Sequence, residues 1–186
     1  MRISTSQLFK KAYKKFAVGA FNVFTMEQVL GLFKGADLCG APIIVAFTPV
    51  ARRYATPAML QAMVSAAAEV YPNVVFSVHL DHGNVEHCND AIKFGNYNSV
   101  MIDASHEPID KNTEITKEIV KKAHAKGIQV EAELGVLSGV EDDINVDDKD
   151  ALFTNPQQAF EFVSKTRCDS LAVAVGTSHG AYKFKT

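Results

Sequence analysis

Several histidine and carboxylate side chains in this 186-residue sequence stand where a short apolar segment ends. In chain order they are Asp81, His82, Asp103, Glu131, Glu133 and His179. One such residue alone is usually a turn former, a loop residue or a helix cap. If four successive parallel strands end in these groups, however, the groups converge into a cluster of nitrogen and oxygen donors. That combination suits zinc or another divalent transition metal, so the sequence predicts a metal site.

The elements that must position these groups alternate between short apolar strands and amphipathic helices. Strands are predicted at 17–21, 43–47, 74–80, 99–102, 128–133 and 171–175. Helices are predicted at 5–14, from the capping box at 25–28, at 56–70, 84–94 and 110–126, and from 155 onward. Thr56-Pro57 and Asn155-Pro156 each combine an N-cap with proline at the first helical position. This alternation predicts parallel strands joined by right-handed crossovers.

The strand faces favour a barrel over an open, doubly wound sheet. Ser77, His79 and Asp81 share one face of their strand, whereas the residues between them are apolar. A doubly wound sheet is covered on both faces and reads as continuous apolar runs. A barrel has an inner face that can become polar near its active-site mouth. We therefore expect an α/β fold, a (β/α)₈ TIM barrel.

Only six of the eight βα units of such a barrel are found in this sequence. Residues 1–186 then form a single domain, the N-terminal part of the barrel, and strands seven and eight would follow Thr186. The expected polypeptide has about 280–330 residues, the size of an ordinary barrel domain. Without that remainder, we expect the chain to be poorly soluble and inactive, because its edge strands expose unpaired backbone groups.

The composition excludes several functional classes. A formal net charge of −2 and 22% charged residues argue against a nucleic-acid binder, which would have a basic patch. No apolar run approaches the ~20 residues of a membrane helix, and the polar N-terminus does not resemble a signal peptide. Cys39, Cys88 and Cys168 lie far apart, which is typical of reduced thiols. We expect a cytoplasmic protein.

Other histidines are predicted to have ordinary roles. His79 points in the same direction as Asp81 but lies deeper, so we interpret it as a hydrogen-bonded interior residue. His87, His106 and His124 are assigned to the surface or to loops. The segment Gly135–Phe153 is an unusually long acidic loop for a compact domain, and such loops often serve as lids.

Six short motifs, in order along the chain, resemble the class II ketose-bisphosphate aldolases. They are GAFNV at Gly19–Val23, HLDHG at His79–Gly83, MIDASH at Met101–His106, VEAELG at Val130–Gly135, GVEDD at Gly139–Asp143 and GTSHGAYKF at Gly176–Phe184. Any one of these motifs is a weak signal. Six in order and with the family's spacing are specific.

The resemblance implies a catalytic zinc ion held by three histidines. His82 and His179 match two of them, and the third would lie beyond Thr186. Asp81 matches the general acid/base at the C4 hydroxyl, and Glu141 matches a mobile-loop glutamate that moves the proton at the substrate carbon. The lid is expected over Leu137–Leu152. Two further carboxylates match positions near the metal, namely Asp103 and Glu133.

The same resemblance implies where the substrate binds. Asn22 and Thr48 match polar positions that contact it. Gly180 and Lys183 match part of a site for phosphate and a monovalent cation, Na⁺ or K⁺. The implied reaction cleaves fructose 1,6-bisphosphate, a phosphorylated ketose, to dihydroxyacetone phosphate and glyceraldehyde 3-phosphate in glycolysis and gluconeogenesis. The full-length enzyme is expected to be a homodimer or homotetramer, without nucleic-acid or membrane partners.

Alternatives remain at this point. Tagatose 1,6-bisphosphate differs from the fructose substrate only at C4, and only the overall resemblance favours fructose. Another metal-dependent barrel enzyme would share the fold and the metal, although the His-x-His pair that such hydrolases often carry after strand one is replaced here by Gly19-Ala-Phe-Asn22. Schiff-base chemistry needs a lysine inside the barrel, and no predicted strand interior carries one. The chain could also be a truncated polypeptide without activity.

Overall fold

A computed structural model describes the chain except residues 137, 142–143, 147–152, 177 and 180–186. For 138–141, 144–146 and 178–179 it describes the backbone alone. The main sheet has six parallel strands in the order β1-β2-β3-β4-β5-β8. Their bounds are β1 Gly19–Asn22, β2 Ile43–Phe47, β3 Phe76–Gly83, β4 Ser99–Ile102, β5 Gln129–Leu134 and β8 Ser170–Val173.

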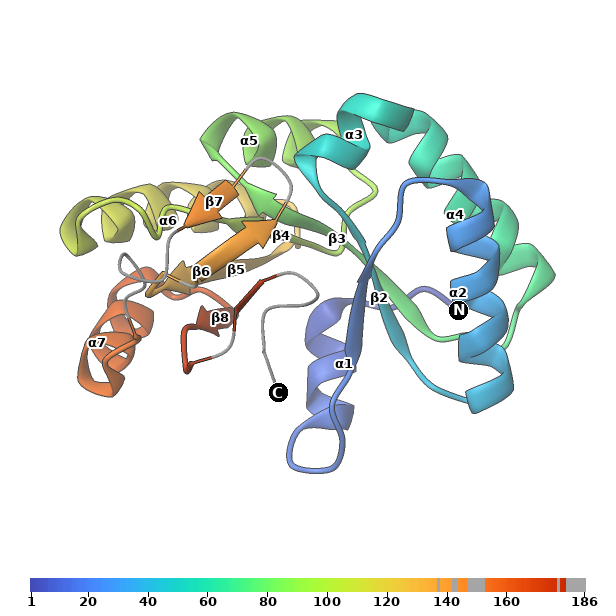
Figure 1. The fold of residues 1–186 in the computed structure, drawn as a ribbon, viewed down its shortest axis with the longest axis horizontal. Coiled ribbons are helices and arrows are strands. Elements are labelled where there is room, and N and C mark those ends of the chain that lie inside the picture. The colour runs from blue at the N-terminus through green and yellow to red at the C-terminus, as the bar shows by residue number, and fades with distance from the viewer. Residues whose placement is uncertain (137, 142–143, 147–152, 177, 180–186) are drawn as a thin grey trace.

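The sheet curves as part of a (β/α)₈ barrel, and most helices follow its outer side (Figure 1). They are α1 Thr5–Ala12, α2 Met26–Cys39, α3 Pro49–Ala55, α4 Pro57–Val70, α5 Val85–Phe94, α6 Ile109–His124 and α7 Pro156–Thr166. The core lies between strands and helices, and Phe33, Phe47 and Leu80 are completely buried there. The six predicted strands are confirmed, with boundaries that differ by a few residues. Every pair of neighbouring strands in this six-stranded sheet is parallel, as the alternation predicted.

Side-chain caps begin most of these helices, as the sequence signals indicate. Thr25 and Gln28 form the predicted capping box of α2, and Thr56 caps α4 by accepting a hydrogen bond from the Met59 N–H. Helix α3 was not predicted. It begins with the same Thr-Pro signal at Thr48, but it has only seven residues before a second signal, so its apolar periodicity is too short to read.

The segment expected to be a long loop contains regular structure. Strands β6 Ser138–Glu141 and β7 Ile144–Val146 pair antiparallel, and β6 pairs parallel with β9 Ser178–His179. The β-branched residues of these short segments favour pairing over a loop conformation. The interpretation of this segment as loop throughout was therefore wrong, whereas the lid role stays a prediction.

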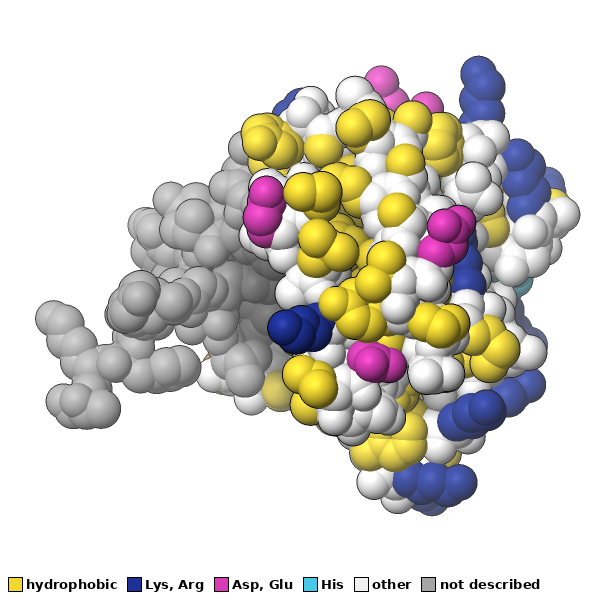
Figure 2. Space-filling view, turned by 90° about the vertical axis from the view of Figure 1, so that its right-hand side faces the viewer, with side chains coloured by type: hydrophobic (Ala, Val, Ile, Leu, Met, Phe, Trp, Pro, Cys, Tyr) yellow, Lys and Arg dark blue, Asp and Glu magenta, His cyan; other side chains and the backbone are white. Residues whose placement is uncertain are grey.

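The outer face of α2 and α4 is unusually apolar. Figure 2 looks onto the side of the molecule that carries these helices, and hydrophobic side chains gather there. Among them, Leu38 is 77% exposed, and Met26, Met59 and Val70 are each more than half exposed. In the described part of the chain, no helix has the length and apolar character needed to cross a membrane.

Candidate active site

Two adjacent residues at the end of β3 form the centre of the candidate site. Asp81 and His82 lie where the pairing of β3 with β4 slips by one residue between Leu80 and Gly83. His82 has a φ of +46°, in the left-handed region that non-glycine residues seldom adopt. An extra residue of this kind bends a strand and redirects its side chains. Asp81 and His82 consequently reach different neighbours.

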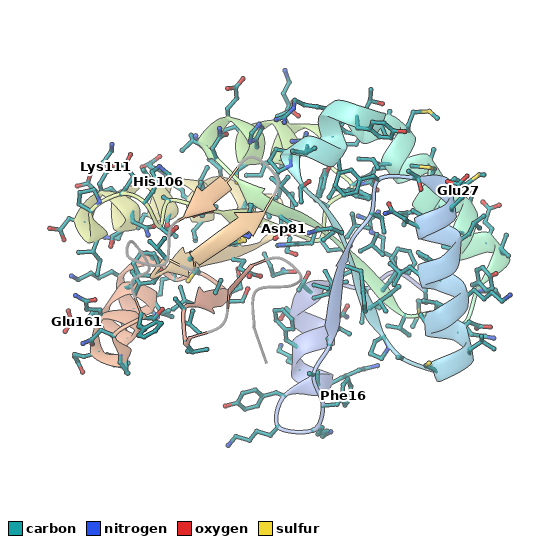
Figure 3. All side chains as sticks on the ribbon, in the orientation of Figure 1. Phe16, Glu27, Asp81, His106, Lys111 and Glu161 are labelled. Atoms are coloured by element: carbon teal, nitrogen blue, oxygen red, sulfur yellow. The ribbon has the colours of Figure 1, made fainter. Side chains whose placement is uncertain are left out.

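Asp81 is oriented towards β1. The Asn22 side-chain N–H donates a hydrogen bond of 3.0 Å to Asp81 Oδ2, so the ends of β1 and β3 are linked across β2. Figure 3 shows Asp81 in the middle of the arc of strands, while Lys111 and Glu161 lie at its periphery. This contact brings together two residues that the sequence predicted as site residues, and their roles stay a prediction.

His82 is oriented towards β4 and β5. Its Nδ1 lies 2.9 Å from Asp103 Oδ2 and 3.8 Å from Glu133 Oε2. One donor atom from each of His82, Asp103 and Glu133 lies within 4.8 Å of the others, and all three side chains are largely buried. Three strands that are successive in the sheet therefore bring together three of the nitrogen and oxygen groups that the sequence predicted to converge. Glu131 does not join them, because its Oε2 accepts a hydrogen bond of 3.2 Å from the Ser170 hydroxyl.

Asp103 is held as a carboxylate by its neighbours. Burial on its own would raise its pKa, but hydrogen bonds from His82 and from the backbone and hydroxyl groups of Ser105 outweigh it and lower the pKa to about 2. Ser105 donates both of its hydrogen bonds to Oδ1, at 3.1 Å and 2.8 Å, while Oδ2 faces His82. With both oxygens engaged, Asp103 is arranged to orient the His82 ring.

Glu133 is anchored by a residue that the sequence reasoning missed. Asn112, in the first turns of α6, is 1% exposed and donates a hydrogen bond of 2.9 Å to the Glu133 carbonyl. Thr116 donates in turn to Asn112 Oδ1. A buried asparagine on the apolar face of a helix was the available signal, because a buried amide needs partners.

The remaining predicted residues have mixed placements. Thr48 is buried and its hydroxyl accepts from the Ala51 N–H as the cap of α3. His79 is interior and hydrogen-bonded to Ser99, as predicted. His106 and His124 are exposed, also as predicted. His87 is half-buried and closes the capping box of α5 with Asn84.

Four predicted site residues fall where side chains are not described. Gly180 and Lys183 lie outside the described residues altogether. For Glu141 and His179 only the backbone is given, and Gly139 of β6 pairs with His179 of β9. The strand that carries Glu141 therefore runs beside the one that carries His179.

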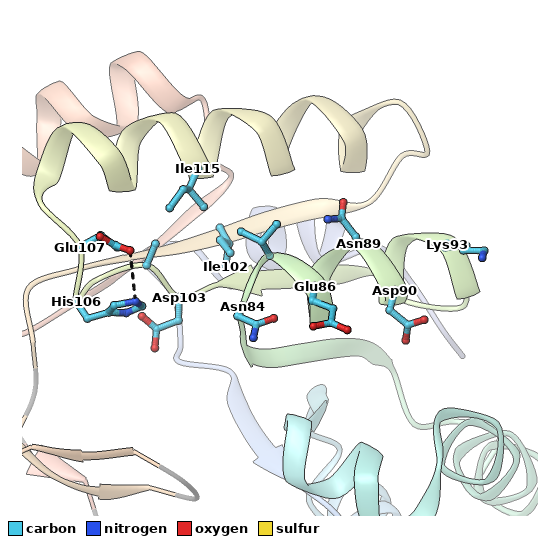
Figure 4. Close-up of a pocket in the computed structure, with 12 residues that line it drawn as sticks. Asn84, Glu86, Asn89, Asp90, Lys93, Ile102, Asp103, His106, Glu107 and Ile115 are labelled. Atoms are coloured by element: carbon cyan, nitrogen blue, oxygen red, sulfur yellow. Dashed lines mark ion pairs between the residues drawn. The ribbon is translucent and has the colours of Figure 1, made fainter.

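An open hollow of about 730 Å³ lies between α5 and the loop that precedes α6 (Figure 4). Its charged lining is mostly acidic, with Glu86, Asp90, Asp103 and Glu107 against the single lysine Lys93. Such a lining repels phosphate groups, so this hollow does not suit a phosphorylated ligand. The inner side of the sheet, where the side chains of Asp81 and His82 lie, is the better candidate for binding such a ligand.

The donor set fits a divalent transition metal. Imidazole nitrogen and carboxylate oxygen are groups that zinc uses in proteins, and His82, Asp103 and Glu133 each bring one such atom within 4.8 Å of the others. Asp103 adds the partner that metal-bound histidines usually have, a carboxylate that fixes the ring and its tautomer.

Comparisons with known proteins agree with this chemistry. Residues 3–186 match the sequence model of the family described as fructose-bisphosphate aldolase class-II. Fructose-bisphosphate aldolase from Helicobacter pylori is 43% identical over 100% of this chain and 61% of the relative. The enzyme of the same name from Giardia intestinalis is 47% identical over 97% of this chain and 55% of the relative.

A solved structure confirms the fold. The crystal structure of the YdjI aldolase from Escherichia coli K12 superposes with a TM-score of 0.82 at 33% identity, covering 96% of this chain and 64% of that protein. The chain spans about three-fifths of the length of the curated relatives it matches. The fold, the metal-suited cluster and the match along nearly the whole sequence lead to one conclusion: the chain belongs to the class II fructose-bisphosphate aldolase family.

Proposed function

We propose that the complete gene product catalyses the reversible aldol cleavage of fructose 1,6-bisphosphate to dihydroxyacetone phosphate and glyceraldehyde 3-phosphate, with zinc as its resident metal. The observation that carries this proposal is the pair of neighbouring residues at the β3 bulge. Asp81 is available for proton transfer, and His82 meets two carboxylates 3.8 Å away or closer. The name shared by the curated relatives supports fructose over tagatose bisphosphate.

Asp81 takes the proton from the C4 hydroxyl in the cleavage direction and returns it in condensation. A base for this step must be within hydrogen-bond reach of the hydroxyl and hold a fixed orientation. The Asn22 N–H binds one lone pair of Asp81 Oδ2 and holds the carboxylate in place, while further lone pairs of the carboxylate can accept the hydroxyl proton. Removal of the C4 hydroxyl proton lets the C4 oxygen form the aldehyde carbonyl as the C3–C4 bond breaks, and the electron pair of that bond stays on the ketose fragment until C3 is protonated.

His82, His179 and Glu133 are the residues that would hold the zinc ion, with Asp103 orienting the His82 ring. When bound, zinc supplies a Lewis acid that stabilises negative charge on the ketose oxygens next to the breaking bond. Glu141 moves the proton at the substrate carbon, and a lid over 137–152 brings Glu141 to the substrate. Asn22 contacts the substrate, and Gly180 and Lys183 bind its phosphate beside a monovalent cation. Thr48, which is buried and caps α3, shapes the end of β2.

The protein is further proposed to be a cytoplasmic homodimer or homotetramer. The three free cysteines are consistent with a reducing compartment. The apolar outer face of α2 and α4 supports self-association, because exposed apolar patches often mark protein interfaces.

An aldol cleavage assay on the complete gene product tests the function. We expect fructose 1,6-bisphosphate to be cleaved, cleavage to stop after chelation, and zinc to restore it. His82→Ala should abolish the restored activity, whereas His124→Ala, on the exposed end of α6, should not. Tagatose 1,6-bisphosphate is assayed in parallel. Faster cleavage of that sugar would overturn the substrate assignment, and activity unaffected by chelation would overturn the metal mechanism.

A further inference from the structure

A row of buried polar side chains extends from α1 towards the candidate site. Thr5, Ser99 and His79 are 3%, 3% and 5% exposed. The Thr5 hydroxyl lies 3.0 Å from Ser99 Oγ, and Ser99 Oγ lies 2.7 Å from His79 Nδ1. His79 on β3 is the register partner of Ser99 on β4. His79 also lies two positions before Asp81, on the same face of β3. Nothing in the proposed mechanism uses this row.

The direction of the hydrogen bonds follows from counting protons. If Thr5 donates to Ser99, the Ser99 proton goes to His79 Nδ1, and both hydroxyl protons are used. In the reverse direction Ser99 donates to Thr5, and the buried Thr5 proton meets no acceptor among the described contacts. Buried hydroxyl groups rarely leave a proton unpaired, so the first direction is favoured. His79 then accepts at Nδ1 and carries its hydrogen on Nε2.

That hydrogen faces the proposed base. His79 Nε2 lies 4.0 Å from Asp81 Oδ1, while the other carboxylate oxygen accepts from Asn22. The opposite tautomer would place an unshared electron pair of Nε2 against the carboxylate, which is repulsive. A separation of 4.0 Å is longer than a hydrogen bond, and such catalytic contacts commonly shorten when substrate binds.

We propose that His79 is a positioning residue for Asp81. The Thr5–Ser99 pair locks the His79 ring in the Nε2–H tautomer, and that N–H fixes the orientation of the Asp81 carboxylate from the side opposite Asn22. This inference rests on the proposed function, because it assigns Asp81 the role of the base. It also explains why a hydroxyl at the start of α1 is buried against β4: the helix helps to set the tautomer below the active site.

Two substitutions separate the two ends of the ring. In His79→Asn the side-chain amide reaches the position of Nδ1 and can keep the Ser99 contact, but it has no group at Nε2. In His79→Gln the amide reaches the position of Nε2 and can keep an N–H towards Asp81. We expect kcat to fall roughly 10²-fold in His79→Asn, the cost of a misplaced catalytic group, and only a few-fold in His79→Gln, with KM nearly unchanged in both. His124→Asn and His124→Gln are the matched controls, expected to be silent.

The tautomer itself is measured without activity. Long-range proton–nitrogen correlation spectra of the ¹⁵N-labelled gene product should give an unprotonated Nδ1 and a protonated Nε2 for His79, and Ser99→Ala should remove this preference. This measurement stands even where the His79 variants fail to fold. A protonated Nδ1 in the unmodified protein, or equal losses of kcat in the Asn and Gln variants, would overturn the proposal.

The outcome is distinguishable from failure of the proposed function. If the protein cleaves neither ketose bisphosphate, the ¹³C shift of the Asp81 carboxyl carbon replaces kcat as the readout. A shift that changes in His79→Asn but not in His79→Gln supports the positioning role. A carboxyl shift that is the same in all three proteins contradicts it.

Discussion

Asp81 and His82 are consecutive in the chain but belong to two different environments. Asp81 contacts Asn22 of β1 and faces His79 within β3. His82 contacts Asp103, which directly follows β4, and lies close to Glu133 of β5. The Asp81 side provides N–H groups, and the His82 side provides carboxylates. The first environment suits a residue that moves a proton, and the second suits one that holds a metal cation.

A regular strand could not bring the side chains of both Asp81 and His82 to the inner side of the sheet. Successive side chains of a strand point to opposite faces, so one of the two residues would be directed into the helix layer. The one-residue slip between Leu80 and Gly83 and the left-handed backbone at His82 allow both side chains to reach the inner side. The comparison indicates that the bulge places two neighbouring residues in two separate environments.

The largest expected effect comes from removing each residue alone. Asp81→Ala should lower the cleavage rate of the complete gene product by roughly 10²–10⁴-fold, the usual contribution of a positioned proton-transfer group, while metal content barely changes. His82→Ala should instead lose the metal. Metal analysis alongside steady-state kinetics separates the two outcomes. Loss of metal in Asp81→Ala, or stoichiometric zinc after both His82 and His179 are changed to alanine, would break the division of roles.

The next effect tests whether Asp103 acts through His82. Asp103→Asn keeps the shape of the side chain but weakens the charge that orients the imidazole, so we expect metal affinity to fall about 10–100-fold. Competition with a chromophoric chelator measures this affinity. Asp110→Asn, an exposed acid in the first turn of α6, is the control. An unchanged affinity in Asp103→Asn would show that the His82 ring is fixed by other contacts.

Destabilisation of the β3 bulge should affect the Asp81 and His82 environments at the same time. A Cβ at Gly83 would lie 2.7 Å from Leu80 Cδ2 and 3.0 Å from the Met101 carbonyl oxygen, inside a buried corner. Gly83→Ala should therefore cost about 1–3 kcal/mol of the free energy of unfolding, as overpacking usually does, and should lower both metal affinity and activity. Denaturant melts measure the first effect.

Gly35→Ala is the matched control, because a Cβ there meets nothing within 4 Å in the middle of α2. This variant should gain about 0.5–1 kcal/mol from the higher helix propensity of alanine. Loss of stability at Gly35 as well as at Gly83 would mean that glycine itself, and not the crowding at the bulge, is the cause.

The sequence predicted the strands, most helix starts and the convergence of His82, Asp103 and Glu133. These features depend on local signals, namely apolar runs, caps and the common edge that parallel strand ends share. It could not predict the bulge, because the slip arises from the pairing of β3 with β4 and not from the residues of one strand. It also missed Asn112 and the Thr5–Ser99–His79 row, since buried polar contacts between distant segments depend on tertiary packing.

The smallest expected effect is on the alkylation rate of Cys88, a thiol that packs against the β3 bulge. Cys88 is fully buried in α5, its Sγ lies 3.3 Å from the Met101 carbonyl oxygen, and burial raises the pKa of this thiol to about 12. Since the thiolate is the reactive form, about one molecule in 10⁴ is deprotonated at pH 8, and the rate should rise about tenfold per pH unit until it levels off near that pKa. Exposed Cys39 should therefore be alkylated first, with Cys88 protected in the unmodified protein and more reactive in Gly83→Ala. Mass spectrometry of the peptides after timed alkylation measures both rates. Equal protection of Cys88 in the two proteins would place the strain of Gly83→Ala elsewhere than at the bulge.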